Sequence, residues 1–130
     1  MYLLDSDWII QALANRQPAL STLERLASGR IYVSYITMGE IYERAFESVN
    51  PEAHVLTFRQ FLSAYRALTL SDPIMERFAE VRSVLRRRGQ LIPDFDLLIS
   101  ATALHHELTI LTFKRRDFER ILDFRIYQPG

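Results

Sequence analysis

Short apolar runs alternate along the chain with longer segments in which apolar residues recur at helical spacing. Runs rich in leucine, β-branched and aromatic residues predict short strands at residues 2–4, 31–33, 68–70 and 108–111, and a weaker one at 124–126. Helical spacing, with Pro or Gly near the boundaries, predicts helices at residues 8–14, 20–26, 37–46, 51–65, 72–88 and 94–106, and a helical turn at 117–121. The pattern is therefore one of strands and helices in alternation.

This alternation predicts the fold class. Strands joined through helices favour right-handed crossovers and a mainly parallel sheet with helices on both faces. The expected fold is α/β, a three-layer α/β/α sandwich around a short-stranded central sheet. No repeat, linker or low-complexity tract interrupts the pattern, so residues 1–130 are expected to form a single domain.

The composition limits the cellular location of the protein and the kinds of metal site that it can form. The chain has no cysteine, which excludes disulfides and thiolate metal sites and fits a reducing, cytoplasmic location. The N-terminal residues lack the pattern of a signal peptide, and no apolar stretch is long enough to cross a bilayer. The formal net charge is zero, which argues against purely electrostatic capture of nucleic acid.

Three acidic residues fall where such a sheet would bind a ligand. Open α/β sheets bind ligands beyond the carboxyl ends of their strands, where the strand order reverses. Asp5 follows the first predicted strand, and Glu40 lies in the first turn of the helix after the second. Asp96 lies in the first turn of the helix that leads into the fourth. Asp96 reaches the same edge of the sheet only if the long helical segment before it brings the chain back to that edge. Periodicity alone cannot show whether it does.

Each acid also has a purely structural explanation. Asp5 could be an ordinary turn residue after a strand. Thr37 and Glu40 fit a capping box, in which Thr37 caps the helix and Glu40 reaches back to its amide. Asp96 could complement the dipole of the helix that it begins, and Asp7 could cap the first helix. None of these acids demands chemistry when it is taken singly.

Helix geometry separates Asp94 from Asp96. Residues two apart on a helix do not face the same way, so both can point into one site only if the first lies outside the helix. The economical arrangement makes Asp94 the cap behind Pro93 and turns Asp96 inward.

Convergent carboxylates would predict a metal site. Like charges a few ångströms apart raise each other's pKa, a cost that a cation among them would offset. Carboxylate oxygens without imidazole or thiolate ligands select hard cations, here Mg²⁺ or Mn²⁺. Such an ion suits phosphodiester hydrolysis, because it polarises the phosphoryl group and lowers the pKa of an attacking water.

Three segments of the chain carry a resemblance to a known family. They are "LLDSD" at the start, "YITMGEIYERA" around Glu40, and "RRRGQLIPDFDLLISATALHHELTILTFKRRDFERI". In order and spacing they resemble PIN-domain ribonucleases, and most closely the VapC toxins of bacterial and archaeal type II toxin–antitoxin systems. The resemblance runs from end to end, and "PDFDLLISATAL" followed by "ILTFKRRDF" is its most specific part.

The resemblance implies a PIN-like sandwich that cleaves RNA with Mg²⁺ or Mn²⁺. By position, Asp5, Glu40 and Asp96 match the acids that hold the metal and support catalysis. Ser6 and Thr112 match positions that help to organise the site. The resemblance also implies a homodimer and a cognate VapB-like antitoxin that blocks the site.

The last loop departs from the family pattern. Lys114 stands where many relatives carry Asn or Asp, so a fourth acid is missing there. Lys114 could contact the scissile phosphate, or it could weaken a second metal position. Asp94 and Asp117 are only weak candidates for the site, since Asp94 falls where the family tolerates other residues and Asp117 precedes a Phe that usually packs.

Two groups of arginines are candidates for RNA contact. Arg86, Arg87 and Arg88 end the long predicted helix, and Arg115 and Arg116 lie in the last loop. Positive charge at a helix C-terminus is favourable by itself, but Arg also suits contacts to RNA phosphates. Both explanations remain open for each group.

The N-terminal half carries more apolar residues than three short helices need to pack one face each. A homodimer surface or a groove for an antitoxin helix would account for the excess. The favoured function is a metal-dependent endoribonuclease of the VapC type. The alternative is a PIN domain with weakened catalysis that binds RNA or protein, an interpretation that Lys114 favours.

Overall fold

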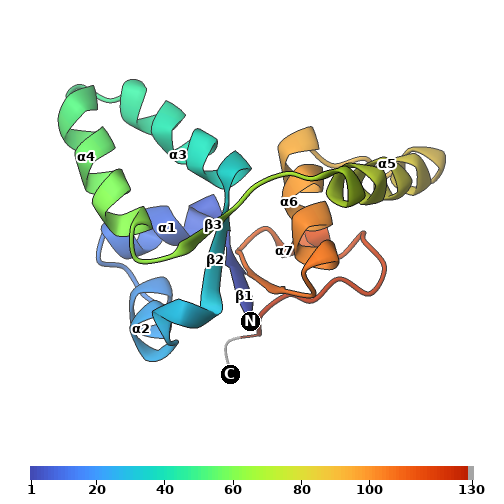
Figure 1. Ribbon diagram of the computed structural model, residues 1–130, viewed down its shortest axis with the longest axis horizontal. Helices are drawn as coiled ribbons and strands as arrows, with labels where there is room; N and C mark the ends of the chain where they lie inside the picture. Colours follow the sequence, from blue (N-terminus) through green and yellow to red (C-terminus); the bar gives the residue numbers. More distant parts are fainter. Residues whose placement is uncertain (129–130) are drawn as a thin grey trace.

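Four short parallel strands form the centre of the molecule, in the order β3-β2-β1-β4. The computed structural model describes residues 1–128. In chain order the elements are β1 (Tyr2–Leu4), α1 (Ser6–Leu13), α2 (Ala19–Arg25), a 3₁₀ helix (Ser28–Arg30), β2 (Ile31–Ser34), α3 (Tyr35–Phe46), α4 (Pro51–Leu62), β3 (Arg66–Leu68), α5 (Asp72–Arg87), α6 (Asp94–His105), β4 (Thr109–Leu111) and α7 (Arg115–Phe118). Helices α1–α4 lie on one side of the sheet and α5–α7 on the other (Figure 1).

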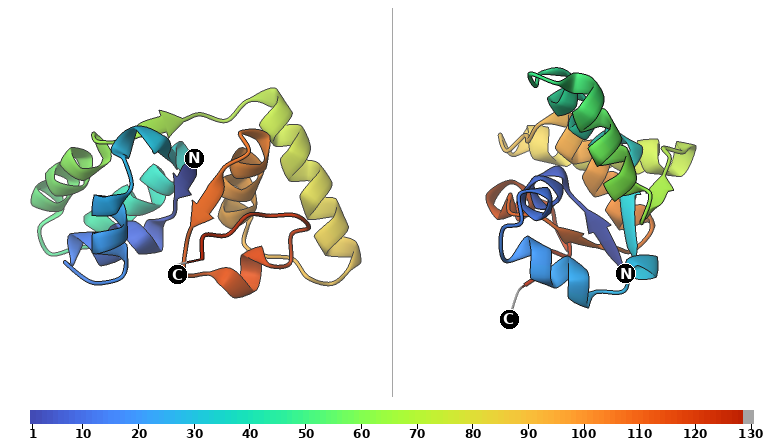
Figure 2. Two further views of the ribbon diagram at one scale, coloured as in Figure 1. Left: turned by 90° about the horizontal axis from the view of Figure 1, so that it is seen from below. Right: turned by 90° about the vertical axis from the view of Figure 1, so that its left-hand side faces the viewer.

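The two faces of the sheet bury two separate apolar clusters. Successive residues of a strand point to opposite faces, and β1 and β4 follow this rule. Leu4 and Leu111 pack among α1–α4, whereas Leu3 and Ile110 pack among α5–α7. The three layers are visible edge-on in Figure 2. The predicted α/β class and three-layer arrangement are therefore confirmed.

Local sequence explains where several helices begin and end. The Ser34 side chain caps α3 by accepting a hydrogen bond from Ile36 N at 3.1 Å. Asn50 caps α4, and Pro51 occupies its first turn, where a missing N–H costs nothing. After α5, Gly89 adopts a φ of +65°, which favours glycine, so the helix stops there.

The structure corrects several predicted boundaries. Asp5 caps α1 and Ser34 caps α3, so the capping roles proposed for Asp7 and Thr37 are wrong. Strand β3 lies at Arg66–Leu68 rather than at 68–70. In place of a strand at 124–126, the described chain has one parallel bridge between Ile110 and Ile126. The turn predicted at 117–121 begins earlier, as α7.

Within the described part of the chain, every helix is too short or too polar to span a lipid bilayer.

We expect Ile99→Ala to lower the free energy of unfolding by about 2–5 kcal/mol, because it leaves a cavity in a packed core. Ile99 is fully buried in the cluster between the sheet and α5–α7. Denaturant unfolding followed by circular dichroism would measure the change. Val49→Ala is the control: Val49 is 102% exposed, so the effect should stay within about 0.5 kcal/mol. Equal losses in the two variants would contradict the described core.

Candidate active site

The sheet reverses its strand order at β1, which lies between β2 and β4. Asp5 directly follows β1, and its amide donates to Leu111 O at the end of β4, at 3.1 Å. The Asp5 side chain is fully buried. Its Oδ1 accepts from Ser6 N at 2.8 Å, as the cap of α1. A carboxylate therefore stands at the position where open α/β sheets bind ligands.

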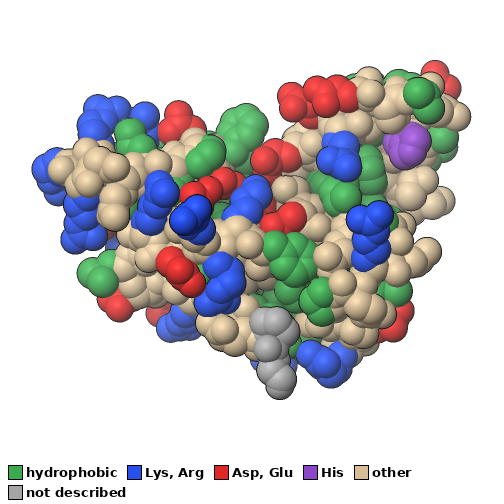
Figure 3. Space-filling model, turned by 180° about the vertical axis from the view of Figure 1, so that it is seen from behind, with side chains coloured by type: hydrophobic (Ala, Val, Ile, Leu, Met, Phe, Trp, Pro, Cys, Tyr) green, Lys and Arg blue, Asp and Glu red, His purple; other side chains and the backbone are tan. Residues whose placement is uncertain are grey.

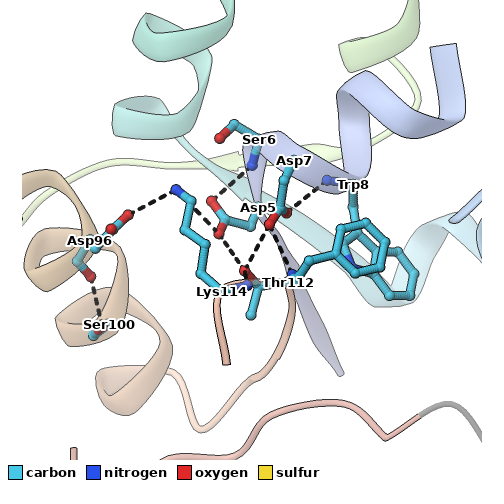
Figure 4. A network of polar contacts seen from close by, with 9 residues as sticks. Asp5, Ser6, Asp7, Trp8, Asp96, Ser100, Thr112 and Lys114 are labelled. Carbon is cyan, nitrogen blue, oxygen red and sulfur yellow. Dashed lines mark hydrogen bonds and ion pairs between the residues drawn. The ribbon is translucent and has the colours of Figure 1, made fainter. Parts of the chain in front are cut away.

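Thr112 and Asp7 complete a network across β1 and β4. The Thr112 hydroxyl donates to Asp5 Oδ2 at 2.7 Å and lies 3.3 Å from Asp7 Oδ2. The same Asp7 oxygen accepts from Phe113 N at 2.8 Å (Figure 4). Burial, reinforced by the charge of Asp5, raises the pKa of Asp7 to about 6. The network fixes Asp5 between the two strand ends.

Lys114 lies between the carboxylates of Asp5 and Asp96. Its Nζ is 3.2 Å from Asp96 Oδ1 and 3.9 Å from Asp5 Oδ2 (Figure 4). Burial raises the pKa of Asp96, and the charge of Lys114 partly opposes that rise. Burial lowers the pKa of Lys114, but the charges of Asp5 and Asp96 outweigh it, so the net shift is upward. The lysine is thus held in its charged form.

Glu40 faces the same group of charges from α3. Burial raises its pKa to about 7; Lys114 opposes the rise, and Asp5 and Asp96 add to it. Its Oε1 is buried and has no hydrogen-bond partner. Glu40 does not reach back to cap α3, as the capping-box explanation required. An unpartnered buried carboxylate oxygen is a costly group that a cation would satisfy.

The donor chemistry of these side chains fits a hard divalent cation, but their present spacing is wide. Carboxylate oxygens are the ligands that Mg²⁺ and Mn²⁺ prefer. Yet residues 1–128 contain no group of three or more acidic or imidazole side chains close enough together to hold a metal ion. Lys114 occupies the space between two of the acids. Asp5, Asp96 and Glu40 are the side chains whose oxygens could serve as ligands of a divalent ion here.

Asp94 and Asp96 separate as helix geometry predicts. Asp96 is buried at 4% exposure, whereas the Asp94 side chain is 63% exposed and binds Arg82 Nε at 2.9 Å. The predicted capping role of Asp94 is wrong, because Pro93 is the N-cap of α6 and Asp94 is its first residue. The proline begins the helix one position early, and Asp94 turns to Arg82 of α5.

The remaining candidates are Asp117 and the two arginines of α7. Asp117 lines the same hollow as Asp96 and Lys114, and lies 4.0 Å from Arg120. Arg115 pairs with Glu119 at 3.3 Å within α7. Arg116 is exposed on the same short helix.

The arginines at the end of α5 are not brought to the acids. Arg87 and Arg88 line a separate hollow with Arg120 and Leu122, and Arg86 is exposed. None of the three lines either hollow beside the acids. Their position favours the structural explanation, positive charge at a helix C-terminus.

Two hollows open beside the acids. One, of about 470 Å³, is lined by Ser6, Asp7 and Glu40, among others. The other, of about 690 Å³, is lined by Glu40, Asp96 and Lys114, among others. Phe95 borders both and is 54% exposed. In Figure 3 acidic side chains lie close together near the middle of the face, with Lys and Arg side chains around them.

Sequence reasoning missed two residues of this site. The sequence predicts a helix cap at Asp7, but its carboxylate joins α1 to the loop after β4 by accepting from Phe113 N. No pattern within a few residues could reveal a contact across 106 positions. Phe95 was passed over, but an apolar side chain between two acids at the start of a helix was a signal that it faces solvent beside the site.

The family of the chain follows from comparison with known proteins. A family model of the PIN domain matches residues 2–122. The chain therefore belongs to the PIN-domain family, and the resemblance read from its motifs is confirmed.

Relatives with curated names are VapC ribonucleases. Ribonuclease VapC2 of Haemophilus influenzae is 28% identical over 124 residues, which cover 95% of this chain and 94% of the relative. The tRNA(fMet)-specific endonuclease VapC of Salmonella typhimurium is 26% identical over 125 residues, with 96% and 95% covered. The chain is thus similar to these proteins along nearly its whole length.

Solved structures of VapBC complexes contain chains with the same fold. A chain of DNA-bound VapBC from Salmonella typhimurium matches with a TM-score of 0.90 at 26% identity, over 97% of this chain and 96% of that one. A chain of VapBC2 from Rickettsia felis, bound to a promoter DNA fragment, has a TM-score of 0.90 at 24% identity, with 99% and 98% covered.

We expect Asp7→Ala to lower the free energy of unfolding by about 1–3 kcal/mol, because it removes the acceptor for Phe113 N and detaches the loop after β4 from α1. Thermal and denaturant unfolding would measure the loss. The control is Glu80→Ala, since Glu80 forms only an exposed pair with Arg77; its effect should stay within about 0.5 kcal/mol. A loss no greater than the control's would show that the Asp7 contacts contribute little.

Proposed function

We propose that this chain is a metal-dependent endoribonuclease that hydrolyses RNA phosphodiester bonds and is inhibited by a cognate antitoxin. The observation that carries the proposal is the set of buried carboxylates around one cation at the strand-order reversal. Membership of the PIN family and the names of the relatives supply the reaction class. Cytoplasmic location would follow from the RNA substrate.

Asp5, Glu40 and Asp96 would hold Mg²⁺ or Mn²⁺. The bound ion would polarise the phosphoryl group and lower the pKa of the attacking water. Asp5 is fixed for this role by the Thr112 hydroxyl and by the amide of Ser6. Asp96 is fixed because it belongs to a buried turn of α6, in which Ser100 Oγ donates to Asp96 O at 2.6 Å. Rigid ligands of this kind support a preorganised site.

RNA would approach over the two hollows. Arg116 is exposed on α7, just after the loop that carries Lys114, and could contact RNA phosphates. Arg115 is partly exposed on the same helix and could do so too. The exposed ring of Phe95 could stack on an unpaired base beside the scissile phosphate. The relative from Salmonella typhimurium is named for tRNA(fMet), which makes tRNA the first substrate to test.

A protein partner is supported by apolar residues exposed at α3 and α4. Phe46, Val49 and Leu56 are 68%, 102% and 58% exposed. Large exposed apolar side chains in one region favour a protein interface. We propose that an antitoxin covers this surface, since similar chains occur in VapBC complexes; a homodimer contact remains our prediction.

A second function is favoured by Lys114. Its ammonium group already neutralises part of the acid cluster, so the chain could bind RNA or protein without a metal and without cleavage. Metal dependence of cleavage distinguishes the two functions.

We expect the purified protein to cleave tRNA with Mg²⁺ or Mn²⁺ and to lose this activity in EDTA. Asp5→Asn and Asp96→Asn should each lower kcat/KM by at least about 100-fold, the loss typical of removing one electrostatic group from an active site. Gel-based cleavage assays would measure this. Asn is also a good helix cap, so Asp5→Asn should still fold.

Glu80→Gln is the control, because Glu80 forms only an exposed pair with Arg77 on α5 and lines neither hollow beside the acids. Its activity should change by no more than about threefold. Undiminished cleavage in EDTA, or an Asp96→Asn variant as active as the wild type, would refute the proposed mechanism.

A further inference from the structure

Lys114 is the one lysine of the chain, and its backbone is firmly held. Its amide donates to the Thr112 hydroxyl at 3.1 Å, and its carbonyl accepts from Phe118 N at 3.3 Å, at the start of α7. The side chain extends from this fixed point to the acids and is 34% exposed. The ammonium group is therefore tethered beside the site but free to move at the end of a flexible four-carbon stem.

No other basic residue among residues 1–128 forms an ion pair with Asp5 or Asp96. The nearby arginines have other partners: Arg82 pairs with Asp94, Arg115 with Glu119 and Arg120 with Asp117. Lys114 thus supplies the positive charge that two buried carboxylates need in the metal-free protein.

The ammonium group and a divalent ion would compete for the same oxygens. Mg²⁺ binds carboxylate oxygens at about 2.0–2.1 Å. The Lys114 ammonium contacts Asp96 Oδ1 and lies near Asp5 Oδ2, so an ion bound to both oxygens would displace it. Two positive groups in this space would also repel each other.

We propose that Lys114 is a displaceable internal counter-ion that occupies the position of the divalent metal until the metal binds. This inference rests on the proposed metal site. In the metal-free protein Lys114 stabilises Asp5 and Asp96; on metal binding it leaves them while its backbone stays in place. The metal affinity is therefore lower than the carboxylates alone would give.

The test is Mn²⁺ titration by isothermal calorimetry of the full chain and of Lys114→Met, which keeps most of the stem but removes the charge. We expect Lys114→Met to bind Mn²⁺ about tenfold more tightly, because the ion no longer has to displace an ammonium group from the two carboxylates. Lys114→Arg keeps the charge and should stay close to the wild type. Arg77→Met removes an equal charge from an exposed pair on α5 and should leave the affinity unchanged.

Thermal unfolding gives a second measurement that does not depend on cleavage. Without metal, Lys114→Met should melt below the wild type, because Asp5 and Asp96 lose their counter-ion. Saturating Mn²⁺ should raise its Tm by more than it raises that of the wild type. A variant that fails to fold without metal but folds with Mn²⁺ would support the proposal equally.

The outcomes separate this inference from the proposed function. If the wild type binds Mn²⁺ and Lys114→Met binds it equally or more weakly, the counter-ion role is overturned while the metal site stands. If Lys114→Met binds Mn²⁺ and the wild type does not, the competition is supported and the metal-dependent function of the native chain fails. If no variant binds Mn²⁺, both are overturned.

Discussion

The burial of carboxylates at the carboxyl edge of the sheet is the constraint on which the rest of this structure depends. Asp5 is fully buried and Asp96 nearly so, and Glu40 buries one oxygen without a partner. Removing such groups from water is costly unless a positive charge compensates them. A fold selected for stability alone would replace them with apolar side chains. Their presence supports the metal site that we propose.

The strand order and the helices together position the residues at this edge of the sheet. The strand order places the ends of β1 and β4 side by side, so Asp5 and Thr112 meet although they are 107 positions apart. Helix α5 carries the chain away and α6 brings it back, and both pack their apolar residues on the same face of the sheet. The first turn of α6 then places Asp96 opposite Asp5. Core packing thus holds the backbone of both acids in place.

Much of the fold could be predicted from short-range pattern. Strand and helix periods gave the alternation and the three layers, and helix geometry correctly turned Asp96 inward and Asp94 outward. The errors at the starts of α1 and α3 share a physical cause, competition among neighbouring capping residues. Asp5 and Ser34 each lie closer to the strand end than Asp7 and Thr37 do, so each helix begins earlier than predicted.

The contacts that define the site could be found only from the three-dimensional structure. Periodicity could not show that Asp7 accepts a bond from Phe113, nor that Lys114 reaches Asp96. The resemblance marked Lys114 as unusual but left its effect open, because the sequence gives no direction for a long flexible side chain. Electrostatics decides the direction of the Lys114 side chain, because its ammonium group is attracted to the most buried carboxylates within its reach.

The direction of the Lys114 side chain helps to distinguish an enzyme from a binding module at this site. In a binding module the ion pairs of Lys114 would be the end state, and the acids would serve only to orient a lysine. Glu40 argues against this, since its buried Oε1 remains unpartnered with Lys114 in place. One ammonium group carries one charge, whereas several carboxylates with little solvent share the site. A divalent ion would supply the positive charge that one ammonium group cannot, and this is why we propose that Lys114 gives up its place to the metal.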